Sequence, residues 1–202
     1  MIDRFYPVVP TADWVARLVP VGVRFIQLRI KDQPEGELRR QVRAANAVCA
    51  RHGAALVVND YWKIAIDEKA PWVHLGQEDL VDADVRAIRR AGLRLGISTH
   101  DHAELERGLV VDPDYVALGP IWRTALKKMP WAPQGLERIG EWKKAIGGRP
   151  LVAIGGLTLE RALQCLAAGA DCAAVVGDIV NNPDPSGQAR AWIAATRPAV
   201  SA

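Results

Sequence analysis

Short apolar runs that are rich in β-branched residues recur along this chain at intervals of roughly 20 to 25 residues. A charged stretch with helical spacing lies between most of them, so strands and helices are expected to alternate. The runs lack a clean alternation of apolar and polar residues, which is typical of parallel strands covered by helices on both faces. Eight strands are predicted, at residues 5–9, 23–28, 55–58, 72–75, 94–97, 115–118, 151–154 and 173–176.

The stretches between these runs have the spacing of amphipathic helices. Several of them end at a glycine, as in ARHG, RRAG and AAGA, and glycine is the residue favoured just past a helix C-terminus. Eight helices are predicted, at residues 11–19, 37–51, 63–68, 82–91, 102–109, 136–146, 159–168 and 186–195.

Eight βα repeats can close into a barrel or lie open as a doubly wound sheet. The barrel is favoured because the repeat count is eight and no GxGxxG fingerprint follows the first strand. We therefore predict an α/β fold in which residues 1–202 form a single-domain (β/α)8 TIM barrel. One long irregular connection, 119–134, follows the sixth strand, and long loops in compact domains are usually functional.

Composition limits the classes of partner. The chain has 26 basic and 23 acidic residues without a long run of like charge, which argues against a nucleic-acid partner. The chain has three cysteines, Cys49, Cys165 and Cys172, which is an odd number, and they lack the spacing of metal ligands. We therefore expect them to be thiols in the reduced state that serve for packing. We recognise no secretory segment and no run of the ~18 apolar residues that span a bilayer. A cytoplasmic protein that acts on small molecules, without a membrane partner and able to form a homo-oligomer, is expected.

In barrels of this kind the active site is built from the C-terminal ends of the strands and the loops after them. Gln27, Arg29 and Lys31 alternate at the end of the second strand, so their side chains are expected to share one side and to need polar partners. The other strand ends carry Asn59 and Asp60, Asp79, Ser98 and Thr99, Thr124, Lys127 and Lys128, Gly155 and Gly156, and Gly177.

Several of these residues have a structural interpretation when they are taken alone. Asp60, Asp79 or Ser98 could cap the helix that follows it. Lys127 and Lys128 could be solvated charges on a loop. The functional interpretation gains weight because all of these residues are expected at one rim of the barrel.

The histidines and two of the tryptophans are also open to two interpretations. His74 is expected to be a hydrogen-bonded core residue in preference to a catalytic one. His100 and His102 are expected in a loop and at a helix start in preference to a catalytic pair. Trp122 and Trp131 belong to the long connection, where they could form the wall of a ligand site.

The residue types at the predicted rim favour phosphate chemistry. Asp60 and Asp79 suit Mg²⁺, which commonly binds through one or two carboxylates together with substrate phosphates. Arg29, Lys31 and Lys127 would neutralise a diphosphate. The glycines after the seventh and eighth strands can present backbone N–H groups to a second anion. One diphosphate substrate and one phosphate substrate are therefore indicated, without the identity of either organic group.

A family resemblance adds that identity. The chain resembles the thiamine-phosphate synthase family, in order and over nearly its whole length, through QLRIK, VVNDYWKIA, VHLGQEDL, GISTH, GPIWRTALKK, VAIGGLT and AGADCAAVV. The resemblance implies a cytosolic barrel enzyme that joins hydroxymethylpyrimidine diphosphate to hydroxyethylthiazole phosphate. The products would be thiamine phosphate and diphosphate, formed by magnesium-assisted dissociative loss of diphosphate.

The resemblance also implies roles for individual residues. Asp60 and Asp79 would hold one Mg²⁺ per active site. The catalytic residues would be Arg29, Lys31, Ser98 and Lys127. The pyrimidine diphosphate would be bound by Gln27, Leu28, Arg29, Ile30, Lys31, Asn59, Ser98 and Lys127. The thiazole phosphate would be bound by Thr124, Ala125, Leu126, Gly156, Val176 and Gly177.

Departures from the family pattern fall on the thiazole side. The chain has TALK where the family often has Thr-x-Thr before the lysine, so Leu126 supplies no hydroxyl. Gly177 and Asp178 stand where the family often has Ser-Ala. Asp178 would repel a phosphate unless it points away or caps the following helix.

Two other functions remain as alternatives. A thiazole tautomerase of the same fold would handle thiazole phosphate without a diphosphate, and the carboxylates, Ser98 and Lys127 argue against it. A non-catalytic sensor of thiamine phosphate would need a partner protein, and no interaction tail or linker is apparent in the sequence.

Overall fold

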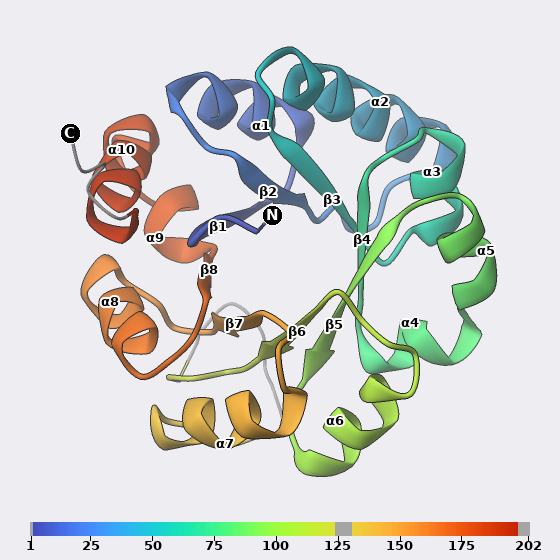
Figure 1. The fold of residues 1–202 in the computed structure, drawn as a ribbon. Coiled ribbons are helices and arrows are strands. Elements are labelled where there is room, and N and C mark those ends of the chain that lie inside the picture. Colours follow the sequence, from blue (N-terminus) through green and yellow to red (C-terminus); the bar gives the residue numbers. More distant parts are fainter. Residues whose placement is uncertain (1, 124–130, 198–202) are drawn as a thin grey trace.

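Eight parallel strands close into a barrel in sequence order, and β8 pairs back onto β1. The computed structural model describes residues 2–123 and 131–197. The helices form an outer ring around the strands (Figure 1). The predicted (β/α)8 barrel is therefore confirmed.

The element bounds agree closely with the periodicity of the sequence. The strands are β1 Phe5–Val9, β2 Phe25–Leu28, β3 Ala55–Asn59, β4 Trp72–Leu75, β5 Arg94–Thr99, β6 Tyr115–Leu118, β7 Leu151–Ile154 and β8 Cys172–Val175. The helices are α1 Ala12–Leu18, α2 Glu35–Arg51, α3 Trp62–Asp67, α4 Gln77–Asp82, α5 Val85–Arg90, α6 His102–Leu109, α7 Glu137–Ile146, α8 Leu159–Ala167, α9 Gly177–Val180 and α10 Pro185–Thr196, with a 3-10 turn at Val19–Val21.

One predicted helix is wrong in outline. The stretch 82–91 is predicted as one helix, whereas the structure has α5 from Val85 to Arg90 and a separate helix α4, Gln77–Asp82, that was not predicted. Ala83 between them is extended, and the Asp84 carboxylate accepts a hydrogen bond of 2.8 Å from Ala87 N–H. Asp84 is thus an N-cap that starts a new helix. The short helix α9 was also not predicted.

Alternation along each strand separates two cores. One set of side chains packs between the strands and the helices, and the other fills the barrel interior. The lower interior is apolar and aromatic, with Phe25, Trp72 and Tyr115 in mutual contact at centroid distances of 5.2 to 6.2 Å. Gly96 on β5 leaves the space that the Tyr115 ring occupies, since a Cβ there would lie 2.0 Å from a ring carbon.

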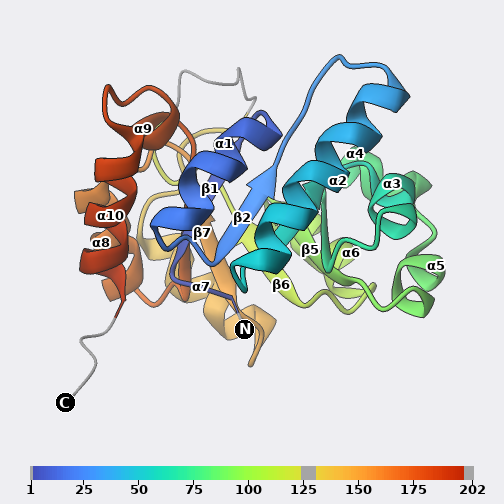
Figure 2. The same cartoon turned by 90° about the horizontal axis from the view of Figure 1, so that it is seen from above.

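The C-terminal ends of the strands share one end of the barrel. In Figure 2, β2 points upward, and the connection from β2 to α2 stands on the same side as α9, which follows β8. The opposite end is tied by Arg197, which bonds Asp3 at 2.7 Å and the carbonyl of Gly22 at 2.8 Å. The loops that could hold a ligand are therefore gathered at the end away from the N-terminus.

The cysteines agree with the packing role expected for them. Cys49, Cys165 and Cys172 are all buried and free. Burial raises the pKa of Cys49 and of Cys165 to about 12, so both thiols stay protonated at neutral pH. Among the described helices, none is both long enough and apolar enough to cross a bilayer.

Candidate active site

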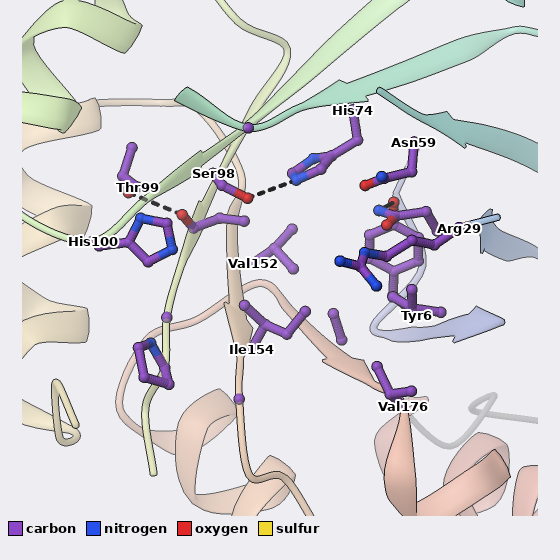
Figure 3. A pocket seen from close by; sticks show the side chains of 18 of the residues that line it. Tyr6, Arg29, Asn59, His74, Ser98, Thr99, His100, Val152, Ile154 and Val176 are labelled. Atoms are coloured by element: carbon purple, nitrogen blue, oxygen red, sulfur yellow. Dashed lines mark hydrogen bonds between the residues drawn. The ribbon is translucent and has the colours of Figure 1, made fainter. Parts of the chain in front are cut away.

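A cavity of about 560 Å³ opens at the C-terminal ends of the strands. Its floor is the upper layer of the barrel interior, where the inward-facing positions of β2 to β5 carry Gln27, Asn59, His74 and Ser98. Figure 3 shows His74 and Ser98 side by side, with Asn59 and Arg29 on the adjoining wall. The interior thus changes from apolar to polar where the strands end, as the position of active sites in this fold leads one to expect.

The second strand delivers its polar side chains as predicted. Gln27, Arg29 and Lys31 all line the cavity, and the Gln27 amide nitrogen donates a 2.8 Å hydrogen bond to the Tyr6 hydroxyl. Leu28 and Ile30 alternate with them and lie buried in the core outside the barrel. The implied contact of these two side chains with a substrate is therefore not supported, because the period of the strand turns them away from the cavity.

Asp60 and Asp79 come together at the rim beside β3 and β4. Asp60 has a φ of 63°, which is uncommon for a non-glycine residue, and its N–H bonds the His74 carbonyl at 2.9 Å. Lys31 Nζ lies 2.7 Å from Asp60 Oδ2. Burial and the neighbouring Asp60 carboxylate raise the pKa of Asp79, and Lys31 acts in the opposite direction. Two carboxylates in such proximity would be stabilised by a cation between them.

The capping interpretations of the rim residues are not confirmed. The N-cap of α3 is Tyr61 and that of α4 is Gly76, so Asp60 precedes its cap and Asp79 lies in the first turn of α4. The helix after Ser98 is capped by Asp101, whose carboxylate accepts a 2.8 Å bond from Glu104 N–H. Asp60 and Ser98 are thus not helix caps.

Oxygen is the only ligand type that the pair Asp60 and Asp79 offers. Within the residues that the structure describes, no cluster of three or more His, Cys, Asp or Glu side chains could hold a metal. Two carboxylates at the rim of an open cavity fit a hard cation that completes its shell with water and phosphate oxygens, as Mg²⁺ does. They fit Zn²⁺ less well, because zinc sites in proteins are built mainly from Cys sulfur and His nitrogen.

His74 is buried and hydrogen-bonded, as expected, but it also lines the cavity. Its Nε2 lies 2.8 Å from Ser98 Oγ and its Nδ1 lies 2.8 Å from the Tyr115 hydroxyl. Burial is the main cause that lowers the pKa of His74 to about 4, with Arg29 and His100 acting in the same direction and Asp60 opposing. His74 is therefore an uncharged ring at neutral pH.

This lowered pKa predicts a pH-dependent stability. The unfolded chain takes up a proton at His74 below its ordinary pKa of about 6.5, whereas the folded chain does not until pH about 4. The free energy of unfolding should therefore fall as the pH drops from 6.5 to 4, by at most about 3 kcal/mol from this residue. Urea unfolding of the wild type and of His74→Gln between pH 7.5 and 4.5 measures it. The difference between the two proteins should shrink toward low pH, and a constant difference would contradict the assignment.

The glycine loops line the opposite wall of the cavity. Gly155 and Gly156 have φ values of 102° and 66°, and a Cβ at Gly156 would lie 2.6 Å from the Arg123 carbonyl oxygen. Only glycine fits this close approach of two chain segments. Gly156, Val176 and Gly177 all line the cavity, as the sequence predicted.

Asp178 points away from the cavity. Its Oδ2 accepts hydrogen bonds of 2.7 Å from Gln188 Nε2 and from Trp192 Nε1, both on α10. The carboxylate therefore holds α10 against the loop after β8 and does not oppose an anion at Gly177. This is one of the two arrangements that the sequence left open for an acidic residue at this position.

Four residues assigned to substrate binding lie outside the described residues, namely Thr124, Ala125, Leu126 and Lys127. Lys128 lies there too. Their roles stay predictions.

Several cavity residues were not singled out for a role from the sequence. Arg123 lines the cavity in addition to Arg29 and Lys31, and it is the third described Lys or Arg residue there. His100 also lines it, stacked on Trp131 at a centroid distance of 3.9 Å. Glu104 Oε2 lies 2.7 Å from His100 Nδ1 and accepts a 2.8 Å bond from His100 N–H. Trp131 thus forms part of the cavity wall, which is one of the two interpretations given for it from the sequence. Trp122 instead packs against the core, with the Arg161 guanidinium over its ring.

Sequence signals for these residues were weak. Asp101 and Glu104 have the spacing of a capping box, which could have drawn attention to the backbone of His100. Arg123 sits in a long loop whose path no periodicity predicts. Its place at the cavity follows from the contact of its loop with Gly156.

Comparisons with known proteins agree on one family. Residues 5–179 match the family model described as thiamine monophosphate synthase. The chain is 59% identical over 197 residues to a thiamine-phosphate synthase of Rhizobium etli, covering 98% of this chain and 97% of that protein. It is 51% identical over 179 residues to a thiamine-phosphate synthase of Cronobacter sakazakii, covering 89% and 85%.

Solved structures support the fold. A thiamine phosphate pyrophosphorylase from Pyrococcus furiosus superposes with a TM-score of 0.84 at 24% identity, covering 96% of this chain and 95% of that one. The 3-hexulose-6-phosphate synthase of Salmonella typhimurium superposes with a TM-score of 0.69 at 16% identity, covering 96% and 98%. At these identities the likeness concerns the barrel itself.

Proposed function

The chain belongs to the thiamine monophosphate synthase family, and we propose that it joins hydroxymethylpyrimidine diphosphate to hydroxyethylthiazole phosphate. Its activity is that of a thiamine-phosphate synthase, a transferase. The observation that carries the substrate assignment is the division of one cavity, with cations and paired carboxylates at β2 to β4 and glycine loops after β7 and β8. This division suits a diphosphate at one side and a monophosphate at the other.

Asp60 and Asp79 are the residues that would hold Mg²⁺. The raised pKa of Asp79 reflects in part the proximity of the Asp60 carboxylate, and this repulsion favours a bound cation. When bound, Mg²⁺ supplies positive charge that stabilises a departing diphosphate. The position of Lys31, 2.7 Å from Asp60, keeps a second positive charge at the same place.

Arg29 and Lys31 are proposed to bind the diphosphate together with Lys127. A guanidinium can bind two phosphate oxygens in parallel, and an ammonium acts as a compact charge. Both groups stabilise negative charge that grows as the leaving group departs, so their contribution is larger in the transition state than in the bound substrate. Asn59 and Ser98 would orient the substrate on the cavity floor.

The glycine side of the cavity is proposed to bind the thiazole phosphate. Gly156 and Gly177 allow the phosphate to approach the backbone closely. Arg123 adds a cation at this loop, and Asp178 is engaged by α10. These contacts offset the hydroxyl that Leu126 lacks.

Chemistry of this kind needs no nucleophile from the protein. The bond between the pyrimidine methylene carbon and the diphosphate oxygen breaks with its electron pair on oxygen. The amino-substituted ring spreads the positive charge that remains, and the thiazole nitrogen supplies the pair for the new C–N bond. The protein's part is to hold the two rings together, exclude water and neutralise the diphosphate. The tautomerase alternative is not favoured by the family match or by the relatives.

The test of the proposed function is formation of thiamine phosphate by the purified chain. With both substrates and Mg²⁺ we expect one diphosphate released for each thiamine phosphate formed. Omission of either substrate, or addition of a chelator, should abolish both products. Isomerisation of a thiazole phosphate without a diphosphate substrate would support the tautomerase, and tight binding of thiamine phosphate without turnover would support a sensor.

A further inference from the structure

A continuous chain of hydrogen bonds crosses the barrel interior beneath the cavity. The Gln27 amide nitrogen lies 2.8 Å from the Tyr6 hydroxyl, which lies 3.0 Å from the Tyr115 hydroxyl. Tyr115 lies 2.8 Å from His74 Nδ1, and His74 Nε2 lies 2.8 Å from Ser98 Oγ. We call these five residues the interior chain. It connects β2, β1, β6, β4 and β5 in that order.

Four of the five members of the interior chain line the cavity, and only Tyr115 does not. Gln27 and Ser98 line the cavity, whereas Tyr115 is fully buried beneath it. Burial raises the pKa of Tyr6 and Tyr115 well above the ordinary tyrosine value, so both hydroxyls keep their protons. In Figure 3 the bond between His74 and Ser98 faces the cavity that also receives Asn59 and Arg29.

The chemistry of the end groups gives the interior chain a direction. The Gln27 amide nitrogen can only donate, so Tyr6 accepts from it and its own proton goes to Tyr115. Tyr115 then donates to His74 Nδ1, which leaves the single proton of the uncharged ring on Nε2. Nε2 donates to Ser98 Oγ, and the Ser98 proton is left for the cavity. The opposite direction would leave the Tyr6 proton facing a donor in a buried place, which is unfavourable.

We propose that the interior chain couples Gln27 to Ser98, so that Gln27 presents its amide oxygen to the pyrimidine while Ser98 presents its hydroxyl proton. If the Gln27 amide were turned over, every bond would reverse and Ser98 would become an acceptor, so the two ends change only together. This pair of groups selects a ring that has an exocyclic amine on one side and a ring nitrogen acceptor on the other. Tyr115 is a positioning residue that acts through His74. The proposal rests on the proposed function for the identity of the ring, but the direction of the chain does not.

The direction can be measured without substrate. The chain has four histidines, so long-range proton–nitrogen correlation spectra of the ¹⁵N-labelled protein can be assigned with His74→Gln. We expect His74 to carry its proton on Nε2 in the wild type. In Tyr115→Phe the ring remains but the donor to Nδ1 is gone, so a mixture of both tautomers is expected. Thr196→Val removes another buried hydroxyl, one that bonds Trp192 on α10, and should leave the His74 spectrum unchanged.

A wild-type ring protonated on Nδ1, or an unchanged tautomer in Tyr115→Phe, would overturn the proposal. The wild-type spectrum decides the direction even if the variant fails to fold.

The consequence for specificity is measured by calorimetry. The wild type should bind hydroxymethylpyrimidine diphosphate at least about 100-fold more tightly than an analogue with a carbonyl in place of the amine, because buried polar groups would be left unpaired. Tyr115→Phe should reduce this ratio about 10-fold, and an unchanged ratio would count against the coupling. If neither compound binds, the proposed function fails, while the imidazole spectra still decide the direction of the interior chain.

Discussion

Asp60→Asn and Asp79→Asn should each lower kcat by about 100-fold or more. Each removes one of the two carboxylates proposed to hold the Mg²⁺ that stabilises the departing diphosphate. The side chains keep nearly the same shape, so folding should be little affected. The double variant should be little slower than the slower single variant, since residues that act as a unit are not additive. Diphosphate release at saturating substrates, measured over a range of Mg²⁺ concentrations, gives the answer.

The single variants should also need more Mg²⁺ for half-maximal rate, because one of two ligands is lost. Asp82→Asn is the matched control: this residue ends α4, the same helix that carries Asp79, and does not line the cavity. It should keep the wild-type rate and the wild-type Mg²⁺ requirement. If Asp60→Asn and Asp79→Asn behaved like this control, the proposed metal site would be wrong.

Gly96→Ala should give the largest loss of stability among single added methyl groups in the barrel interior. Its Cβ would lie 2.0 Å from a carbon of the Tyr115 ring, which is fully buried and stacked on His74 at 5.6 Å. The ring can move only by displacing the side chains packed on it, so a cost of about 1–3 kcal/mol is expected. Displacement of Tyr115 should also break the interior chain and weaken pyrimidine binding.

Thermal unfolding measures this effect. A cost of about 1 kcal/mol lowers Tm by roughly 2–4 °C in a chain of this size. Gly140→Ala is the matched control, because Gly140 lies within α7 and an added Cβ there meets nothing within 4 Å. That variant should be more stable by about 0.5–1 kcal/mol, since alanine favours the helix. A Gly96→Ala protein as stable as Gly140→Ala would show that the interior accommodates the methyl group.

The candidate site was predictable where it depends on strand ends. The order of βα repeats places the C-terminal ends of β3 and β4 side by side, so Asp60 and Asp79 could be expected together although they are far apart in sequence. The alternation Gln27, Arg29 and Lys31 likewise predicted three side chains on one side. The same alternation turns the side chains of Leu28 and Ile30 into the core, so any contact of these two residues with a substrate would be made by their backbone.

The loops were less predictable, because their paths depend on contacts that no local pattern records. Arg123 reaches the cavity through the close approach of its loop to Gly156. Asp178 turns from the cavity because two donors on α10 are there to bind it. The start of α5 had a local signal in its N-cap Asp84, which the predicted helix start at residue 82 overlooked.

Local sequence patterns predicted the number and order of the strands, one main helix between successive strands, the parallel barrel and the residues at each strand end, but not the short helices α4 and α9. The predicted features follow from local periodicity and from the short connections that let successive strands pair. Only the tertiary structure decided which inward-facing side chains meet across the barrel. Tyr6 and Tyr115 are 109 positions apart, and their hydroxyls meet because barrel closure brings the interior side chains of β1 and β6 together, while Gly96 on β5 leaves the space for the Tyr115 ring. The direction of the interior chain, and the hydrogen-bonding character of Ser98, belong to that geometry.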